Sequence, residues 1–160
     1  MKTLLVVALV IGGTAAGASK AAAQNGTALQ PLDQTSAELE RRDQPVTEDD
    51  LRILVRASEI LSSPSVWNRH DTRECHPGDT TWSLFCALEK ASREVLKEYR
   101  HREVALQEVR FAIEDVTDGR EFEHRLRDYN NLPSTEFADI KRILTIATHR
   151  VRIRLTGRHD

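Results

Sequence analysis

The sequence has few of the residue patterns from which common active sites are built. Only two cysteines, one methionine and seven glycines occur in 160 residues, and aromatic residues make up 5%. The glycines form no phosphate-binding loop, and no cysteine or serine is paired by spacing with a histidine that could act as its base. No complete set of zinc ligands occurs at an established spacing. The sequence therefore contains no motif that predicts catalysis.

Strand patterns are also lacking. Apolar and polar residues alternate over no more than three or four positions, whereas a half-buried strand requires a longer alternation. The sequence has no internal repeat. Apolar residues instead recur every three or four positions, and this spacing predicts amphipathic helices. We expect an all-α protein that forms a single compact bundle of four or five helices.

Neither sign of charge is in large excess. The chain has 23 basic and 25 acidic residues, for a formal net charge of −2. Loss of an N-terminal segment that contains Lys2 and Lys20 but no acidic residue would leave the rest more acidic still. Nucleic-acid binding requires a basic surface that neutralises phosphates, so we expect no nucleic-acid partner.

Long apolar runs are absent beyond the N-terminus. Lys2 is followed by the apolar run Leu4–Ile11, by small residues and by Ala21-Ala22-Ala23, which is the pattern of a cleavable signal peptide. The run is about half of the ~20 residues that a membrane-spanning helix needs. We predict a bacterial signal peptide over 1–23, export to the periplasm or the medium, and no membrane span after cleavage. The alternative is an uncleaved anchor over 4–18, which the glycines in that stretch disfavour.

The remaining chain divides into a tether, a domain and a tail. Residues 24–46 are mostly polar and carry few large apolar side chains, so we expect a flexible tether. Residues 47–156 hold the periodic apolar pattern and form the predicted helical domain. Residues 157–160 form a short tail.

Capping residues divide the domain into helices. Thr47 and Asp50 form a predicted capping box at the start of the first helix, which Ser62-Ser63-Pro64 ends. Trp82 to Leu88 is apolar around a wide arc, so we expect this stretch to lie at the centre of the core. The later helices are expected from a cap at Asp79, Thr80 or Thr81 to about Tyr99, from about Arg102 to Val116, over about 121–129, and from a cap at Ser134 or Thr135 onward.

The densest cluster of position-specific residues runs from Tyr129 to Thr135. Two adjacent carboxamides before a proline can satisfy backbone groups at a helix end, which would give them a structural role. Alternatively, they line a polar pocket beside an indole, where a sugar, an amide or a peptide would bind. The candidate ligand-binding residues are Trp67, Trp82, Asn130, Asn131 and Thr135.

The loop of residues 65–79 is long for a compact domain, and loops of this length are often functional. His70, Asp71 and His76 are residue types that bind metals, but their spacing matches no zinc motif. The simplest interpretation is a polar surface loop, and we predict no metal or cofactor. The alternative is a metal-dependent or other hydrolase that uses these three residues.

The two cysteines, Cys75 and Cys86, leave two possibilities open. An exported protein can form a disulfide, which would stabilise the fold by ~3 kcal/mol through the entropy of the closed loop. Equally, both thiols can be free, with Cys86 as a small apolar residue in a helix. The apolar neighbours of Cys86 argue against a nucleophile.

The order of these landmarks resembles a bacterial family of small helical proteins that is known only as a domain of unknown function. The matching residues are Trp67, Cys86-Ala87-Leu88, Tyr129-Asn130-Asn131, Pro133 and Thr135. The resemblance implies a helical fold over about Leu51 to Ala147 and implies no activity. The chain departs from the pattern at Asn131, where the family has Asp, at Glu89, where the family has Gly, and in its export signal.

These observations favour an exported, non-catalytic module that binds an unidentified small ligand or protein. The hydrolase that uses His70, Asp71 and His76 is the alternative. A structural protein whose apolar helical face pairs with a partner is the third interpretation.

Overall fold

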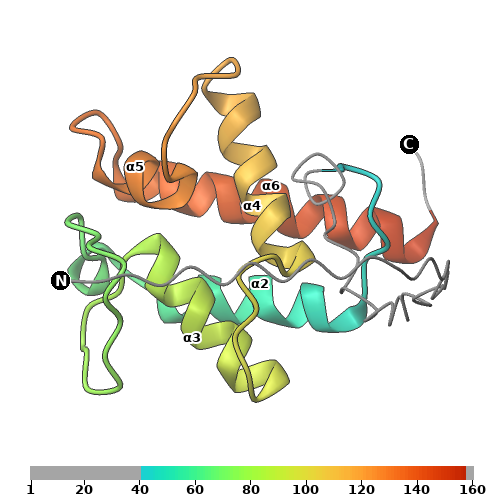
Figure 1. Ribbon diagram of the computed structural model, residues 1–160, viewed down its shortest axis with the longest axis horizontal. Helices are drawn as coiled ribbons and strands as arrows, with labels where there is room; N and C mark the ends of the chain where they lie inside the picture. The colour runs from blue at the N-terminus through green and yellow to red at the C-terminus, as the bar shows by residue number, and fades with distance from the viewer. Residues whose placement is uncertain (1–40, 158–160) are drawn as a thin grey trace, which may run out of the picture. The chain divides into compact units, whose positions relative to one another are not determined.

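Five α-helices and one short 3₁₀ helix make up the regular structure of residues 41–157, the part of the chain that the computed structural model describes (Figure 1). They are α2 (Glu48–Ile60), η1 (Pro64–Val66), α3 (Leu84–Leu96), α4 (Val104–Val116), α5 (Arg125–Asn131) and α6 (Phe137–Thr156). Within 41–157 there is no strand, only an isolated bridge between Trp67 and Trp82. The predicted all-α bundle of four or five helices is confirmed for these residues.

Parts of the predicted organisation lie outside the described residues. These parts are the signal peptide, residues 24–40 of the tether and residues 158–160 of the tail. In the region from 41 to 157, no helix combines the length and the apolar character needed to cross a membrane.

The capping box predicted at the start of α2 is present. The Thr47 hydroxyl oxygen accepts a hydrogen bond from the Asp50 backbone N–H at 3.3 Å, and Asp50 Oδ2 accepts one from the Thr47 backbone N–H at 2.8 Å. The second carboxylate oxygen of Asp50, Oδ1, accepts a hydrogen bond from the Ala105 backbone N–H at 2.9 Å. One buried carboxylate therefore caps the first turns of both α2 and α4.

Three other helix starts differ from the prediction, and one of them is that of α5, which begins at Arg125 rather than near residue 121 and extends through Asn131. Helix α3 begins after Ser83, whose hydroxyl accepts from the Cys86 backbone N–H at 3.1 Å, rather than after residues 79–81. The preceding residue, Trp82, exchanges backbone hydrogen bonds with residues 66 and 68, so this stretch is extended. Helix α6 begins after Glu136, which forms a capping box with Asp139.

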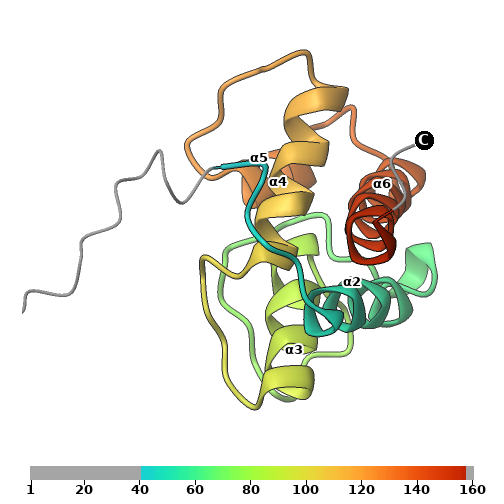
Figure 2. The same ribbon diagram turned by 90° about the vertical axis from the view of Figure 1, so that its right-hand side faces the viewer.

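The helices form two packed pairs around a common core (Figures 1 and 2). Helix α2 packs against α3, and α4 packs against α6. Helices α2 and α6 run side by side in opposite directions, and Figure 2 shows α6 nearly end-on. All residues from Leu84 to Leu88 are buried, so the first half of α3 lies in the core as predicted. The largest fully buried side chains are Ile53, Leu54, Leu61, Leu84, Leu88, Leu106, Val109, Ile113, Ile140, Ile143, Leu144 and Val151.

The last residues of the predicted tether contact the helices. Arg42 donates two hydrogen bonds to the Asp115 carboxylate, at 2.9 and 3.2 Å, and its guanidinium lies 4.8 Å from the centre of the Phe111 ring. Asp115 also pairs with Arg150 of α6, and Val46 packs against the core. The chain entering the domain is therefore bonded to α4 several residues before α2 begins.

Candidate functional site

Asn130 is the centre of a hydrogen-bond network that joins α5 to the tryptophan loop. Its side chain is fully buried. Oδ1 accepts from the Trp67 indole N–H at 2.8 Å and from the Leu84 backbone N–H at 3.0 Å. Nδ2 donates to the Asn68 carbonyl at 3.0 Å and to Asn131 Oδ1 at 3.1 Å. These four bonds use the full hydrogen-bonding capacity of a carboxamide.

The neighbouring polar residues make similar internal contacts. Asn131 Oδ1 accepts from the Asp71 backbone N–H at 2.8 Å, and Asn131 Nδ2 donates to the Asp71 carbonyl at 2.9 Å. The buried Thr135 hydroxyl donates to the Tyr129 carbonyl at 2.8 Å and does not cap α6. This carboxamide pair holds the loop against α5, and apart from the Leu84 N–H at the start of α3 its distant partners are loop groups rather than the helix-end groups expected from the sequence.

The five candidate ligand-binding residues do not share one cavity wall. Trp67, Asn130 and Asn131 lie together, with their polar groups bonded to one another or to the loop. The Trp82 ring lines a separate cavity of about 260 Å³ beside the two cysteines, where Lys90 Nζ lies 4.9 Å from the ring centre. Ligand binding by this group stays a prediction, and the buried Asn130 amide has no hydrogen-bonding capacity left for it.

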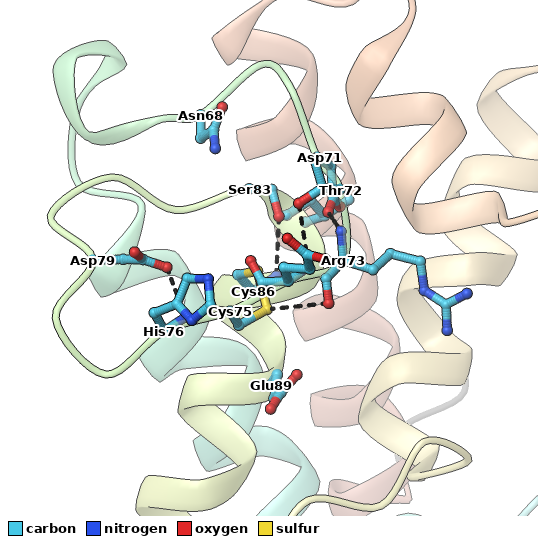
Figure 3. Close-up of a disulfide and its surroundings, with 12 residues drawn as sticks. Asn68, Asp71, Thr72, Arg73, Cys75, His76, Asp79, Ser83, Cys86 and Glu89 are labelled. Atoms are coloured by element: carbon cyan, nitrogen blue, oxygen red, sulfur yellow. Dashed lines mark hydrogen bonds between the residues drawn. A yellow bond between two sulfur atoms is a disulfide. The ribbon is translucent and has the colours of Figure 1, made fainter.

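The cysteines are joined. The sulfur atoms of Cys75 and Cys86 lie at bonding distance, and their Cα atoms are 5.4 Å apart, within the range of a disulfide. Cys86 lies in the first turn of α3 and is buried, whereas Cys75 belongs to the loop. The disulfide therefore attaches the loop to the central helix, and Figure 3 shows it beneath the loop.

The predicted metal residues are not brought together. Asp71 is buried, while His70 and His76 are exposed, and the backbone N–H of His76 donates to Asp79 Oδ2 at 2.8 Å. No group of three histidine, cysteine or acidic side chains among residues 41–157 is placed to hold a metal ion. The loop thus offers no assembled metal centre for the predicted hydrolase alternative.

The buried Asp71 side chain instead forms a hydrogen bond with the backbone of the loop. Its Oδ1 accepts from the Arg73 backbone N–H at 2.7 Å, and its buried Oδ2 has no hydrogen-bond partner. Burial raises the pKa of the Asp71 carboxyl, and the hydrogen bond from the Arg73 backbone N–H opposes that rise. Figure 3 shows Asp71 close to Ser83 and Thr72.

Arg73 has an unusual backbone that points its side chain away from the disulfide. Its φ of 65° lies in the left-handed region, which few residues other than glycine adopt. In Figure 3 the side chain extends outward from the loop. Its guanidinium lies 5.6 Å from the centre of the Phe85 ring, and its Nη1 lies 3.1 Å from Nε2 of His124.

Arg73 forms one wall of a cavity of about 200 Å³, which we call the basic pocket. The disulfide loop, the connection between α3 and α4, helix α4 and the start of α5 all contribute to it. Phe85, Phe122 and Leu126 supply its apolar surface, and Glu123 is its one acidic residue. Its basic side chains are Arg73, His101, Arg110, His124, Arg125 and Arg127.

The positive charges of the basic pocket are unevenly compensated. Arg125 lies 3.5 Å from the Glu114 carboxylate, and Arg127 lies 2.6 Å from that of Asp128. The Arg73 guanidinium, by contrast, has no carboxylate within ion-pair distance in the region from 41 to 157. Its polar contact is an imidazole, which carries no negative charge.

The positive charges around the basic pocket affect the pKa of His101. Partial burial and the nearby guanidinium groups, Arg110 and Arg73 foremost, lower the pKa of His101. Burial raises the pKa of Tyr99 to about 12, so the Tyr99 hydroxyl stays protonated at neutral pH. The Tyr99 oxygen lies 2.9 Å from Nδ1 of His101, to which it can donate. When the Tyr99 hydroxyl donates to Nδ1, a neutral His101 ring carries its proton on the other nitrogen, Nε2.

The basic pocket was not found from the sequence. Its residues are spread from Arg73 to Arg127 and follow no known motif. One weak signal is present in the sequence: His124, Arg125 and Arg127 form a short basic stretch.

Comparisons with known proteins identify no relative: no protein-family model, curated protein or solved structure matches the chain. The family suggested by Trp67, Cys86 and Asn130 therefore stays a prediction.

Proposed function

We propose that this protein is an exported, non-catalytic binding module for a small anionic ligand, and that the ligand occupies the basic pocket. The observation that carries the proposal is the Arg73 guanidinium, which lines the cavity without a carboxylate partner in the described part of the chain. Its fork of N–H groups matches the oxygens of a carboxylate, sulfate or phosphate.

The size of the basic pocket limits the ligand. Its volume of about 200 Å³ is below the range of about 300–1,000 Å³ that is typical of sites for drug-sized molecules. Phe85, Phe122 and Leu126 add apolar surface to a lining that is otherwise polar. A small oxyanion or a short organic acid suits this space better than a cofactor or a folded protein.

Two features support export. The N-terminal pattern is that of a signal peptide. The disulfide between Cys75 and Cys86 is of the kind that persists in oxidising compartments.

The experiment that tests the proposal is a titration of the ¹⁵N-labelled mature protein with sodium sulfate, followed by amide chemical shifts at constant ionic strength. We expect saturable shifts at the backbone of residues 73, 85, 101 and 124–127. In Arg73→Gln these shifts should disappear. The matched control is Arg52→Gln, because Arg52 is an exposed arginine on α2 that does not line the basic pocket.

Two results would contradict the proposal. One is a set of non-saturating shifts spread over all basic residues, which would indicate general ionic effects. The other is equal loss of the response in Arg52→Gln and Arg73→Gln.

A further inference from the structure

The cavity of about 260 Å³ beside the disulfide, which we call the disulfide cavity, shares no lining residue with the basic pocket. Its apolar surface comes from Cys75, Pro77, Cys86 and the ring of Trp82. Figure 3 shows the disulfide that forms part of this surface and joins the loop to α3. Sulfur atoms and an indole both make favourable contacts with aromatic rings. This surface therefore suits a ligand with an aromatic body.

The charged side chains of the disulfide cavity are paired with one another. Glu89 Oε1 accepts two hydrogen bonds from Arg93, at 2.9 and 2.8 Å. Lys90 Nζ lies 3.1 Å from Oε1 of Glu94. The lysine and the arginine that line this cavity thus each have a carboxylate partner, in contrast to Arg73 in the basic pocket. An ionic ligand would have to compete with these pairs, whereas an uncharged ligand would leave them intact.

Trp82 supplies a hydrogen-bond donor that the fold does not use. The indole N–H of Trp67 donates to Asn130 at 2.8 Å. The indole N–H of Trp82 has no acceptor among residues 41–157, and it is not sealed from solvent. An indole N–H can only donate, so its partner in a ligand would be an acceptor such as a carbonyl or hydroxyl oxygen.

From these observations we propose that the disulfide cavity binds a small, uncharged aromatic molecule that carries a carbonyl or hydroxyl oxygen. The aromatic ring lies against the disulfide, Pro77 and Trp82, and the oxygen accepts from the Trp82 indole N–H. The cavity is smaller than the roughly 300–1,000 Å³ typical of sites for drug-sized molecules, which limits the ligand to about one ring. The inference goes beyond the proposed function, because it assigns a second site to a ligand of different charge.

The test titrates the ¹⁵N-labelled mature protein with benzamide and follows the indole N–H signals of its two tryptophans. We expect a saturable shift of the Trp82 signal, because its N–H gains an acceptor. The Trp67 signal is an internal control and should shift much less, because its N–H stays bonded to Asn130.

Two charged analogues test whether the ligand is neutral. At about pH 8 benzoate is an anion and benzylamine a cation, so with benzamide they form a series of similar ring size and different charge. Benzamide should bind the disulfide cavity at least about tenfold more tightly than either ion, because an ion loses hydration without gaining an unpaired partner. Benzoate that enters the basic pocket instead would shift the amides around Arg73 and leave the Trp82 indole signal unchanged.

Trp82→Phe tests the hydrogen bond. The variant keeps an aromatic wall and the backbone hydrogen bonds of position 82, but it removes the indole N–H. The affinity for benzamide should fall about fivefold relative to that for toluene, which has no acceptor oxygen. Backbone amide shifts of residues 75–77 and 89–90 report binding in this variant.

Glu89→Gln tests the charge balance, because it leaves Arg93 without a carboxylate partner. The affinity of the disulfide cavity for benzoate should rise about threefold. The matched control is Glu59→Gln, which breaks a similar pair with Arg56 outside this cavity and should leave the affinity unchanged. A benzoate affinity that stays the same in Glu89→Gln would contradict the argument from paired charges.

The titration of the unmodified protein decides the inference even if a variant does not fold. The absence of a saturable shift with benzamide, saturable shifts that lie away from Trp82, or equal affinities for benzamide and the two ions would each overturn it. An unchanged ratio of benzamide to toluene affinity in folded Trp82→Phe would remove the oxygen from the proposed ligand. None of these results depends on sulfate binding in the basic pocket, so the two sites stand or fall separately.

Discussion

The same loop contributes to the Asn130 network and to the basic pocket. The polar groups of the network are paired with one another, whereas the charge of Arg73 in the pocket has no carboxylate partner among the described residues. Asn130 is fully buried and makes four hydrogen bonds, each to a group of this chain. Arg73 is exposed and has an imidazole for its polar partner. Polar groups that satisfy one another stabilise a fold, whereas a charge left uncompensated is available to a ligand. The same loop thus has one side that stabilises the fold and another side that we propose binds the ligand.

The largest effect is expected where the internal network is broken. Replacing Asn130 with Ala leaves the Trp67 indole N–H, the Leu84 N–H and the Asn68 carbonyl without their partner. We expect the free energy of unfolding to fall by about 3–4 kcal/mol, because each buried unpaired group costs about 1–3 kcal/mol before the loop relaxes. Urea unfolding followed by tryptophan fluorescence measures this.

The matched control for that experiment is Thr145→Ala, which removes an exposed hydroxyl bonded within its own helix. Its effect should stay within about 0.5 kcal/mol. If Asn130→Ala also lowered the free energy of unfolding by only about 0.5 kcal/mol, water would be replacing the Asn130 amide. The loop would then not depend on the Asn130 side chain.

Breaking the disulfide should affect both sides of the loop. The chain segment between Cys75 and Cys86 is short, and loss of the cross-link should destabilise the fold by about 3 kcal/mol through the entropy of the unfolded chain. Sulfate binding should weaken as well, because Arg73 is held two residues from Cys75. Urea unfolding and sulfate titration of Cys75→Ser/Cys86→Ser measure the two effects. Unchanged sulfate affinity in a folded double variant would mean that Asp71 alone positions Arg73.

Asp71→Asn should increase the free energy of unfolding, by less than the losses predicted above. The variant keeps a side-chain oxygen that can accept from the Arg73 backbone N–H. The pKa of Asp71 is raised in the folded state, so folding favours its protonated form. The stability that this group contributes is present at low pH and is lost as the pH rises from the unfolded-state pKa through the folded-state pKa. At neutral pH the variant should therefore be more stable by roughly 0.5–1 kcal/mol.

That gain should vanish when both states are protonated, below the ordinary pKa of 3.8. Urea unfolding at a series of pH values compares the two proteins. A variant that is less stable at neutral pH would show that the Asp71 charge supports the loop.

Replacing Arg73 should change the free energy of unfolding least among these variants and should weaken sulfate binding most. Arg73→Gly places glycine at a φ of 65°, so relief of a left-handed backbone should roughly balance the extra freedom of glycine in the unfolded chain. We expect a change below about 0.5 kcal/mol in unfolding and loss of saturable sulfate binding. Arg73→Gln keeps the side-chain bulk and separates the two causes. A loss of stability above about 2 kcal/mol would place Arg73 with Asn130 as a structural residue.

The structural features that depend only on residues close together in the chain were predicted from the sequence. Thr47 and Asp50 lie three positions apart, and their capping box needs no information from elsewhere in the chain. The apolar arc from Leu84 to Leu88 likewise predicted the centre of the core. The carboxamides Asn130 and Asn131 were recognised as important, with their structural role as one of the two interpretations.

Features that depend on distant residues could not be predicted in the same way. The start of α3 shifted to Ser83 because Trp82 pairs with the backbone around Val66, far before it in the chain. The disulfide required two Cα atoms to lie 5.4 Å apart, which spacing alone does not show. The basic pocket needed Arg73 and His124 in contact across 51 positions, and neither has a sequence signature.

The carboxylate of Asp50 couples the local unfolding of two helix ends. It accepts from Thr47 at the start of α2 and from Ala105 at the start of α4, so the first turns of two helices 55 positions apart share one anchor. Neither turn can fray without removing a partner from the other. In native-state hydrogen exchange, the amides of Asp50 and Ala105 should therefore become exchangeable in a single opening event, with one common free energy. The first turns of α2 and α4 would then open as one cooperative unit.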